Sequence, residues 1–252
     1  MNNYLAKKYI KNLFGYSFYP FNQFLLNKKK NINRTLIFHS IDEKLIFDTY
    51  GFSVNFKDFK NYIYYLKFNN YEFHDFKSKI TSKKSISITF DDGYKNILPA
   101  VDYLIELDIP AIIFVITSKI NDNLYLSSGD INRLSNNKLI TIGSHSHSHP
   151  NFAKLNNLNC IYEIETSIKI IEDIIGDEIN TFAFPYGAYN LNNIKILNKF
   201  NINNICTSDY GYNINFENTI KRIEIVEQDN IESFKRKING FYDYMLIKKI
   251  LK

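Results

Sequence analysis

The sequence predicts an α/β protein, a distorted (β/α) barrel of about seven parallel strands. From residue 34 onward, short apolar runs typical of buried strands alternate with stretches whose apolar residues repeat at helical spacing. Strands that alternate with helices run parallel, because each helix returns the chain to the start of the next strand. With seven or eight strands expected in roughly 220 residues, a closed or nearly closed barrel is favoured over an open sheet.

The expected strands are short runs of β-branched and aromatic residues. Residues 35–38 and 111–116 are almost entirely apolar, as is usual for buried strands in a parallel sheet. Residues 85–90 alternate, which places Ile86, Ile88 and Phe90 on one face. The remaining expected strands comprise residues 139–143, 181–184, 203–206 and 222–226.

The expected helices have recognisable ends. Asn55 is suited to cap a helix that begins at Phe56, because its short side chain can accept a hydrogen bond from the first turn. Isoleucines at helical spacing over residues 161–175 predict the strongest helix, which Gly176 ends. Further helices are expected over residues 97–105, after Asn190 and after Asp229.

Composition limits the class of protein. Hydrophobic residues make up 45% of the 252 residues and charged residues 23%, the balance of an ordinary globular chain. The net charge of +5 is too small to predict nucleic-acid binding. Cys160 and Cys206 are expected to be buried free thiols. Neither a membrane span nor a clear signal peptide is recognisable, so a cytoplasmic location is expected.

Residues 1–33 are expected to form an N-terminal extension to a domain that spans residues 34–252. In this extension lysines alternate with Phe, Tyr and Leu, and three lysines follow one another near its end. One interpretation is peripheral contact of residues 1–30 with the anionic inner face of a membrane. We favour packing of the aromatic residues on the domain, because Gly15 and Pro20 interrupt the helical pattern.

Polar residues follow the expected strands at the rim where active sites of parallel barrels form. Asp91 and Asp92 come directly after residues 85–90, and adjacent carboxylates repel each other unless a cation or a proton relieves them. One of the two can bind a metal while the other faces a water on that metal. Alone, an Asp-Asp-Gly sequence is equally typical of a structural turn.

Three of the five histidines lie in Ser-His-Ser-His-Ser-His-Pro, residues 144–150. His145 and His149, four residues apart, can share one face of a helical turn and bind one ion. Such clusters are rare in protein cores, which favours a metal site, with His147 pointing away. After a further strand, Tyr186 lies between Pro185 and Gly187, either in a rigid loop whose amides form an oxyanion hole or in an ordinary turn.

Three motifs resemble those of a known family in order and spacing: TFDDG (89–93), SHSHSHP (144–150) and FAFPYG (182–187). The family is the polysaccharide deacetylase family, the NodB-homology domain of carbohydrate esterase family 4. LIFHSI (36–41) and RIEIV (222–226) are similar to the first and last strands of the branch that includes the poly-N-acetylglucosamine deacetylases. The resemblance covers residues 34–240 and implies a distorted (β/α) barrel of the NodB-homology type.

The resemblance also implies roles for individual residues. Asp92, His145 and His149 match the metal ligands, and Asp91 matches the catalytic base. The backbone N–H of Tyr186 would stabilise the oxyanion of the reaction. Ser146 matches a hydroxyl that steadies the metal-binding loop.

Two departures from the family pattern concern catalytic groups. Ala183 occupies the place at which many members have the Arg that holds the catalytic base, and we hypothesise that Arg222 substitutes for it. The family's late Leu-x-His motif, which supplies the general acid, is missing, because no histidine follows His149. In the branch named above this role falls to the N-terminal end, so His39 is the candidate acid. The alternative is a buried histidine that bonds to a neighbouring carbonyl.

The implied function is metal-dependent removal of N-acetyl groups from N-acetylhexosamine units of a polysaccharide or glycan intermediate, with release of acetate. An Asp and two His suit Zn²⁺, our first choice, and also Ni²⁺, Co²⁺, Fe²⁺ or Mn²⁺. The expected partner is an N-acetylated carbohydrate and not a nucleic acid. One alternative is a deformylase or other C–N amide hydrolase on a lipid-linked sugar, and another is a catalytically silent carbohydrate-binding relative.

Overall fold

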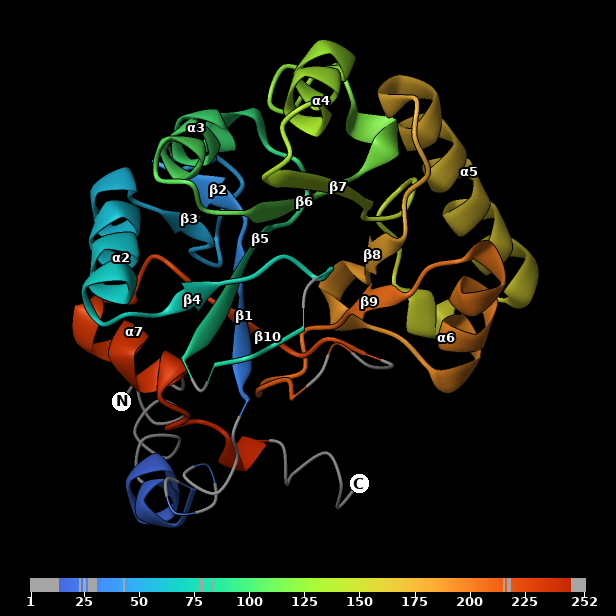
Figure 1. Ribbon diagram of the computed structural model, residues 1–252. Coiled ribbons are helices and arrows are strands. Elements are labelled where there is room, and N and C mark those ends of the chain that lie inside the picture. The colour runs from blue at the N-terminus through green and yellow to red at the C-terminus, as the bar shows by residue number, and fades with distance from the viewer. Residues whose placement is uncertain are drawn as a thin grey trace.

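Seven parallel strands form a strongly curved sheet with helices around its outside (Figure 1). The structure, a computed structural model, describes residues 14–22, 24, 26, 31–42, 44–77, 79–82, 84–214, 216 and 219–245. The strand order is β10-β1-β5-β6-β7-β8-β9. These strands are β1 (Asn33–Phe38), β5 (Ser85–Phe90), β6 (Ala111–Val115), β7 (Ile140–Ser144), β8 (Thr181–Ala183), β9 (Asn204–Cys206) and β10 (Arg222–Glu224). The prediction of a distorted seven-stranded barrel is confirmed.

The barrel nearly closes between β9 and the chain that enters β10. Cys206 forms an isolated parallel bridge with Ile220. The N–H of Ile220 donates to the carbonyl of Ile205 at 2.8 Å, and the N–H of Thr207 donates to the carbonyl of Ile220 at 2.9 Å. Since β10 also pairs with β1, the carboxyl ends of all seven strands face one rim.

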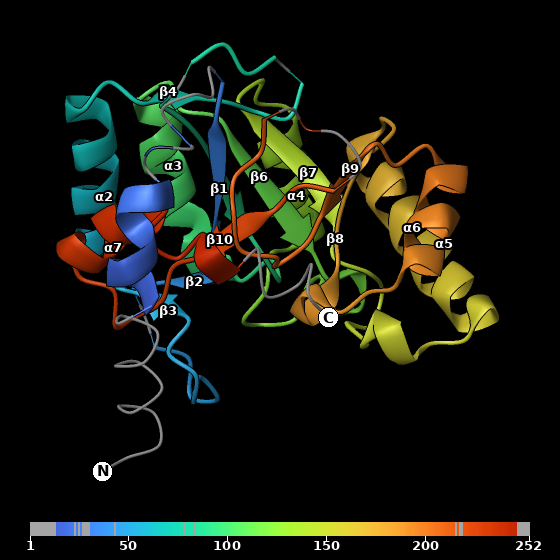
Figure 2. The same cartoon turned by 90° about the horizontal axis from the view of Figure 1, so that it is seen from below.

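Short elements extend this scaffold. β4 (Glu72–Phe73) pairs with the beginning of β5. β2 (Ser40–Ile41) and β3 (Ser53–Val54) form a separate parallel pair beyond the carboxyl end of β1 (Figure 2). The sequence analysis did not identify these three strands, because two residues are too few for an apolar alternation to be recognised.

The helices follow the predicted alternation with strands. They are α2 (Phe56–Phe68), α3 (Leu98–Glu106), α4 (Ser128–Ser135), α5 (Asn157–Ile175), α6 (Leu191–Leu197) and α7 (Ile231–Ile238). The side chains of Asn55 and Asn190 cap α2 and α6 as expected, and Gly176 ends α5 with a φ of 73°. α4 was not predicted, since it buries only Ile131 and Leu134 and therefore lacks a sustained apolar pattern.

The buried apolar residues form one large cluster and a second, smaller one, which consists of Phe76, Ile112, Phe114, Ala183, Cys206 and Ile220. β1, β5 and β6 are buried along their whole length. The ring of Phe38 packs edge-on against Phe59 of α2, with 5.0 Å between the ring centroids. Cys160 and Cys206 are both free and buried, as expected.

Residues 14–22 are helical and lie at the side of the barrel near α7 (Figure 2). The ring of Tyr16 packs edge-on against Phe241, with 4.9 Å between centroids, and the Asn22 side-chain amide donates to the carbonyl of Gly240 at 2.8 Å. Residues 1–13 and 27–30, which hold the lysines behind the prediction of membrane contact, lie outside the described residues. Among the described helices, none has both the length and the apolar character needed to cross a membrane.

Candidate active site

Two strand ends bring the predicted metal ligands together at the rim. Asp92 follows β5, and His145 follows β7 directly. One ligand atom from each of Asp92, His145 and His149 lies within 4.8 Å of the others. Of the described residues, this is the one group of His, Cys, Asp and Glu side chains with such an arrangement.

The spacing of these atoms fits a divalent metal ion. Asp92 Oδ1 lies 3.4 Å from Nε2 of His145 and 3.3 Å from Nε2 of His149. Ligands of a tetrahedral ion at ~2.0–2.1 Å are separated by about 3.3–3.4 Å. Asp92 Oδ1 is also buried and has no hydrogen-bond partner among the described residues, which is unfavourable unless the oxygen binds an ion. The residues present therefore suit a catalytic ion with three protein ligands.

Neighbouring groups orient the His145 imidazole and hold the backbone at His149. Nδ1 of His145 donates to the carbonyl of Ala183 at 2.8 Å, which leaves Nε2 with a lone pair that faces Asp92. The backbone N–H of His149 donates to Ser146 Oγ at 3.0 Å. Burial raises the pKa of Asp92, but the adjacent imidazoles outweigh this effect and hold the pKa well below its usual range. Asp92 is thus a carboxylate, the form that binds metal.

The turns around the site have strained backbone conformations. Asp92, Ser146, His149 and Tyr186 have φ values of 69°, 69°, 62° and 58°, in the left-handed region that non-glycine residues rarely adopt. Each such residue costs about 1–3 kcal/mol and persists only where its surroundings fix it. Four such residues at one rim indicate that the placement of the site side chains is maintained at a cost in backbone conformational energy.

The side chain of Glu163 in α5 holds the loop that carries the three histidines, residues 145–149. Its Oε2 accepts hydrogen bonds from the N–H groups of His147 at 3.0 Å and Ser148 at 2.7 Å. His147 is turned away from the metal ligands, and its Nδ1 lies 2.9 Å from Thr117 Oγ1. The sequence analysis missed Glu163, because a lone Glu on a helix carries no signal of the loop that it will meet.

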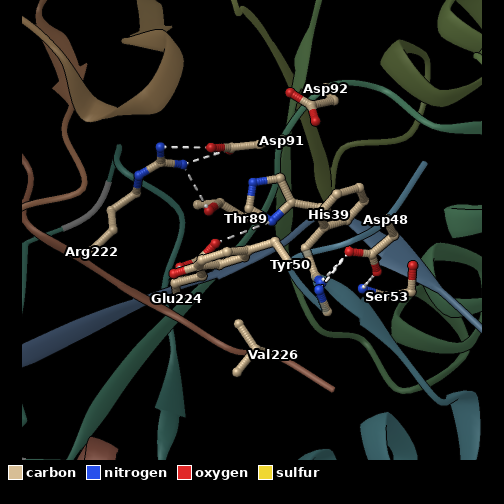
Figure 3. A network of polar contacts seen from close by, with 12 residues as sticks. His39, Asp48, Tyr50, Ser53, Thr89, Asp91, Asp92, Arg222, Glu224 and Val226 are labelled. Atoms are coloured by element: carbon tan, nitrogen blue, oxygen red, sulfur yellow. Dashed lines mark hydrogen bonds and ion pairs between the residues drawn. The ribbon is translucent and has the colours of Figure 1, made fainter. Parts of the chain in front are cut away.

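Asp91 forms a buried, bidentate ion pair with Arg222 at the start of β10 (Figure 3). Nη1 and Nη2 of Arg222 donate to Oδ1 and Oδ2 of Asp91 at 2.6 and 2.8 Å. Arg222 also donates to Thr89 Oγ1 at 3.1 Å and to the carbonyl of Thr207 at 3.0 Å. Burial raises the pKa of the Asp91 carboxyl, but the charge and hydrogen bonds of Arg222, together with the nearby imidazoles of His145 and His39, outweigh this effect and lower the net pKa.

His39 follows β1, whose neighbours in the sheet are β5 and β10. In Figure 3 its imidazole lies between Asp91 and Glu224. Nδ1 of His39 is 4.0 Å from Glu224 Oε1, is buried and has no hydrogen-bond partner among the described residues. The structure thus places His39 beside the predicted base, and no carbonyl of the described residues bonds to its Nδ1.

Tyr186 lies in the turn after β8 with an exposed side chain. Its ring packs edge-on against His149, with 4.5 Å between the ring centroids. The backbone of Tyr186 is therefore next to the cluster of metal ligands. Six of the seven predicted site residues lie at this rim, and Arg222, at the amino end of β10, reaches Asp91 through its side chain.

Residues 78–205, half of the chain, match the family model described as polysaccharide deacetylase. The chain belongs to the polysaccharide deacetylase family. Chitin deacetylase 1 of Cryptococcus neoformans is 32% identical over 101 residues, which are 40% of this chain and 20% of that protein. The matched part thus spans about a fifth of the length of this curated relative.

Solved structures share the fold of this deacetylase domain. A polysaccharide deacetylase from Bacillus cereus superposes with a TM-score of 0.75 at 23% identity, covering 83% of this chain and 69% of the other. A Streptococcus pyogenes deacetylase in complex with acetate gives 0.74 at 19% identity, with 83% and 99% covered. IcaB from Ammonifex degensii gives 0.72 at 15% identity, with 85% and 98% covered.

Proposed function

We propose that this polysaccharide deacetylase removes N-acetyl groups from N-acetylhexosamine units of a carbohydrate, with the help of one divalent ion, and releases acetate. The observation that carries the proposal is the Asp91–Arg222 ion pair directly beside Asp92, His145 and His149. It combines a buried carboxylate that is kept ionised with a three-ligand metal site. The match to a chitin deacetylase and the fold shared with a deacetylase that binds acetate support the same reaction class.

Asp92, His145 and His149 would hold the ion, and Zn²⁺ fits one carboxylate and two imidazoles best. A divalent ion at such a site supplies Lewis-acid polarisation of the acetyl carbonyl and lowers the pKa of a bound water. The Ala183 carbonyl orients the His145 ring, and the Ser146 hydroxyl holds the backbone of the loop at His149.

Asp91 would accept the proton of the attacking water, because its carboxylate is ionised. The two hydrogen bonds from the guanidinium of Arg222 hold this carboxylate in place. The backbone N–H of Tyr186 would donate to the carbonyl oxygen as negative charge develops on it. His39 would donate a proton to the amide nitrogen as the C–N bond breaks. The products are acetate and a free sugar amine, and the proton taken by Asp91 balances the one given by His39.

Acetate release from N-acetylglucosamine oligomers tests the proposal. The protein should release acetate, lose this activity with a chelator and regain it on addition of Zn²⁺. Asp91→Asn should lower turnover by about 10²–10⁴-fold, the range for loss of a general base, while the protein still binds the ion. Asp92→Asn should lose the ion itself, measured by elemental analysis after gel filtration.

A matched control is Asp102→Asn, which removes an exposed carboxylate on α3 that pairs with Arg133. This variant should match the unaltered protein in both measurements. Loss of the ion from the Asp91→Asn protein would contradict the separate roles of the two carboxylates. Acetate release that a chelator does not affect would contradict a metal-dependent reaction.

A further inference from the structure

A loop beside His39 is held in one conformation at the rim. This rim loop, residues 44–52, connects the short strands β2 and β3. The buried carboxylate of Asp48 accepts hydrogen bonds from the N–H groups of Gly51, Phe52 and Ser53, the last two at 3.1 and 2.9 Å. The carbonyl of Gly51 accepts from the N–H of Glu227, which ties the loop to the segment after β10. The loop is thus anchored both internally and to the barrel.

The inner side of the rim loop is packed with aromatic rings. The ring of Phe52 stacks on Tyr94, with 5.9 Å between centroids and 8° between planes, and lies 5.5 Å from the ring of His39. The Phe47 ring packs against both, with 6.4 Å between its centroid and that of Phe52 and 6.1 Å to that of Tyr94. These contacts fix the position of the loop relative to the candidate general acid.

The outer side of the rim loop presents large aromatic surface to solvent. Tyr50 is 67% exposed and Phe47 is 48% exposed. The Tyr50 hydroxyl points to Glu224 Oε2, 3.5 Å away, and the other oxygen of this carboxylate faces His39 at 4.0 Å. Figure 3 shows the Tyr50 ring in front of Glu224 and next to His39. The exposed Tyr50 ring is therefore linked through Glu224 to His39, the group that would protonate the leaving amine.

We propose that Tyr50, assisted by Phe47, forms a sugar-binding subsite for a hexosamine unit that neighbours the unit at the metal site. This inference rests on the proposed function. A sugar ring has an apolar face of C–H groups and polar edges, so it suits a ring that is apolar on its face and polar at its tip. Because the loop is already ordered by Asp48, little conformational freedom is lost when the sugar binds.

The position of the subsite predicts a preference for oligomers. Tyr186, 71% exposed beside His149, flanks the metal site on the side of β8, whereas Tyr50 flanks it on the side of β1. A chain of several sugars that places one acetyl group at the metal site can reach Tyr50 with an adjacent unit. A monosaccharide cannot occupy both places at once.

Binding of N-acetylglucosamine pentamer and monomer, measured by calorimetry on the full chain with chelator present to prevent turnover, tests the subsite. Tyr50→Ala should weaken pentamer binding about five- to tenfold, the equivalent of one aromatic contact, and monomer binding less than twofold. Tyr50→Phe should keep most of the pentamer affinity, because the ring face is retained.

The matched control is Tyr64→Ala, since Tyr64 is 66% exposed but lies on the outer face of α2. It should bind the pentamer as the unaltered protein does. Equal pentamer affinity in the Tyr50→Ala and Tyr64→Ala proteins, or no pentamer binding by the unaltered protein, would overturn the subsite. Acetate release, measured separately, decides the proposed function: loss of pentamer binding in Tyr50→Ala supports the subsite even if no acetate is formed.

Discussion

At the scale of single residues, Arg222 is a buried charge whose contacts bear on both stability and catalysis. It is fully buried, and its guanidinium lies 5.2 Å from the ring centroid of Phe114 while it bonds to Asp91, Thr89 and the Thr207 carbonyl. A buried charge is tolerated only when it is paired and hydrogen-bonded in this way. The ion pair therefore serves the fold as well as the chemistry, and the two roles can be separated by substitution.

We expect Arg222→Ala to destabilise the protein by about 3–5 kcal/mol, because it leaves the buried Asp91 charge without its partner. Arg222→Lys should cost less stability, since it keeps the charge, but should still lower acetate release because one ammonium cannot reproduce the two parallel hydrogen bonds. Urea unfolding and acetate release measure the two effects.

Arg133 provides the control for this prediction, because it pairs with Asp102 at 3.1 Å on the surface, where both side chains are about half exposed. Arg133→Ala should change stability by less than about 1 kcal/mol. If Arg222→Ala unfolds at the same urea concentration as Arg133→Ala, the ion pair with Asp91 contributes nothing to stability.

The sequence was informative about single residues where a strand end carries an unusual side chain. Asp91, Asp92 and His145 follow predicted strands, so the rule that strand ends converge was enough to bring them together. Glu163, Thr89 and the Thr207 carbonyl could not be found in this way. Their contacts depend on the closure of the barrel and on the direction of α5, which no local pattern encodes.

At the scale of elements, the rim loop depends on one side chain. Burial raises the pKa of Asp48, but the hydrogen bonds from Ser53, Gly51 and Phe52 favour its charged form and lower the net pKa. A group whose pKa is lower in the folded state than the ~3.9 of an unfolded chain stabilises the fold above that pH. This stabilisation is lost as the pH falls through the folded-state pKa.

Asp48→Asn should therefore destabilise the protein by about 1–3 kcal/mol at pH 7, the usual cost of lost hydrogen bonds to a charged group. At a pH below the folded-state pKa of Asp48, the difference from the unaltered protein should shrink, because both side chains are then neutral. Urea unfolding of both proteins at pH 7 and in acid measures this difference in the free energy of unfolding. A difference that grows on acidification would mean that the Asp48 carboxylate does not stabilise the loop.

Elements of very different length were predicted with different success. α5 has five isoleucines at helical spacing and a terminal glycine, and its end at Ile175 agrees with the prediction. The pair β2 and β3, which supports the rim loop, has two residues in each strand and was missed. Its pairing is fixed by tertiary contacts and not by a local apolar pattern.

At the scale of the whole molecule, a second buried ion pair joins distant parts of the chain. Arg34 at the start of β1 donates to both carboxylate oxygens of Asp243, each at 2.8 Å, across 209 positions of sequence. Asp243 also accepts from Asn22 Nδ2 at 3.1 Å, so the helical residues 14–22 and the last described segment meet at the same place. The apolar alternation predicted the barrel, but it contains no information on such contacts between the two ends.

We expect Asp243→Ala to destabilise the protein by about 3–5 kcal/mol, because it leaves the Arg34 charge buried and unpaired. The double variant Arg34→Met with Asp243→Leu should recover most of this loss, since apolar side chains of similar volume avoid the desolvation of both charges. Urea unfolding of Arg34→Met, Asp243→Leu and the double variant completes the cycle that gives the coupling free energy of the pair. Lys235→Met, which breaks an exposed pair with Glu232 on α7, is the control and should cost less than about 1 kcal/mol. A double variant that is less stable than Asp243→Ala would show that the two ends need the charges themselves, and not merely a filled volume, to hold together.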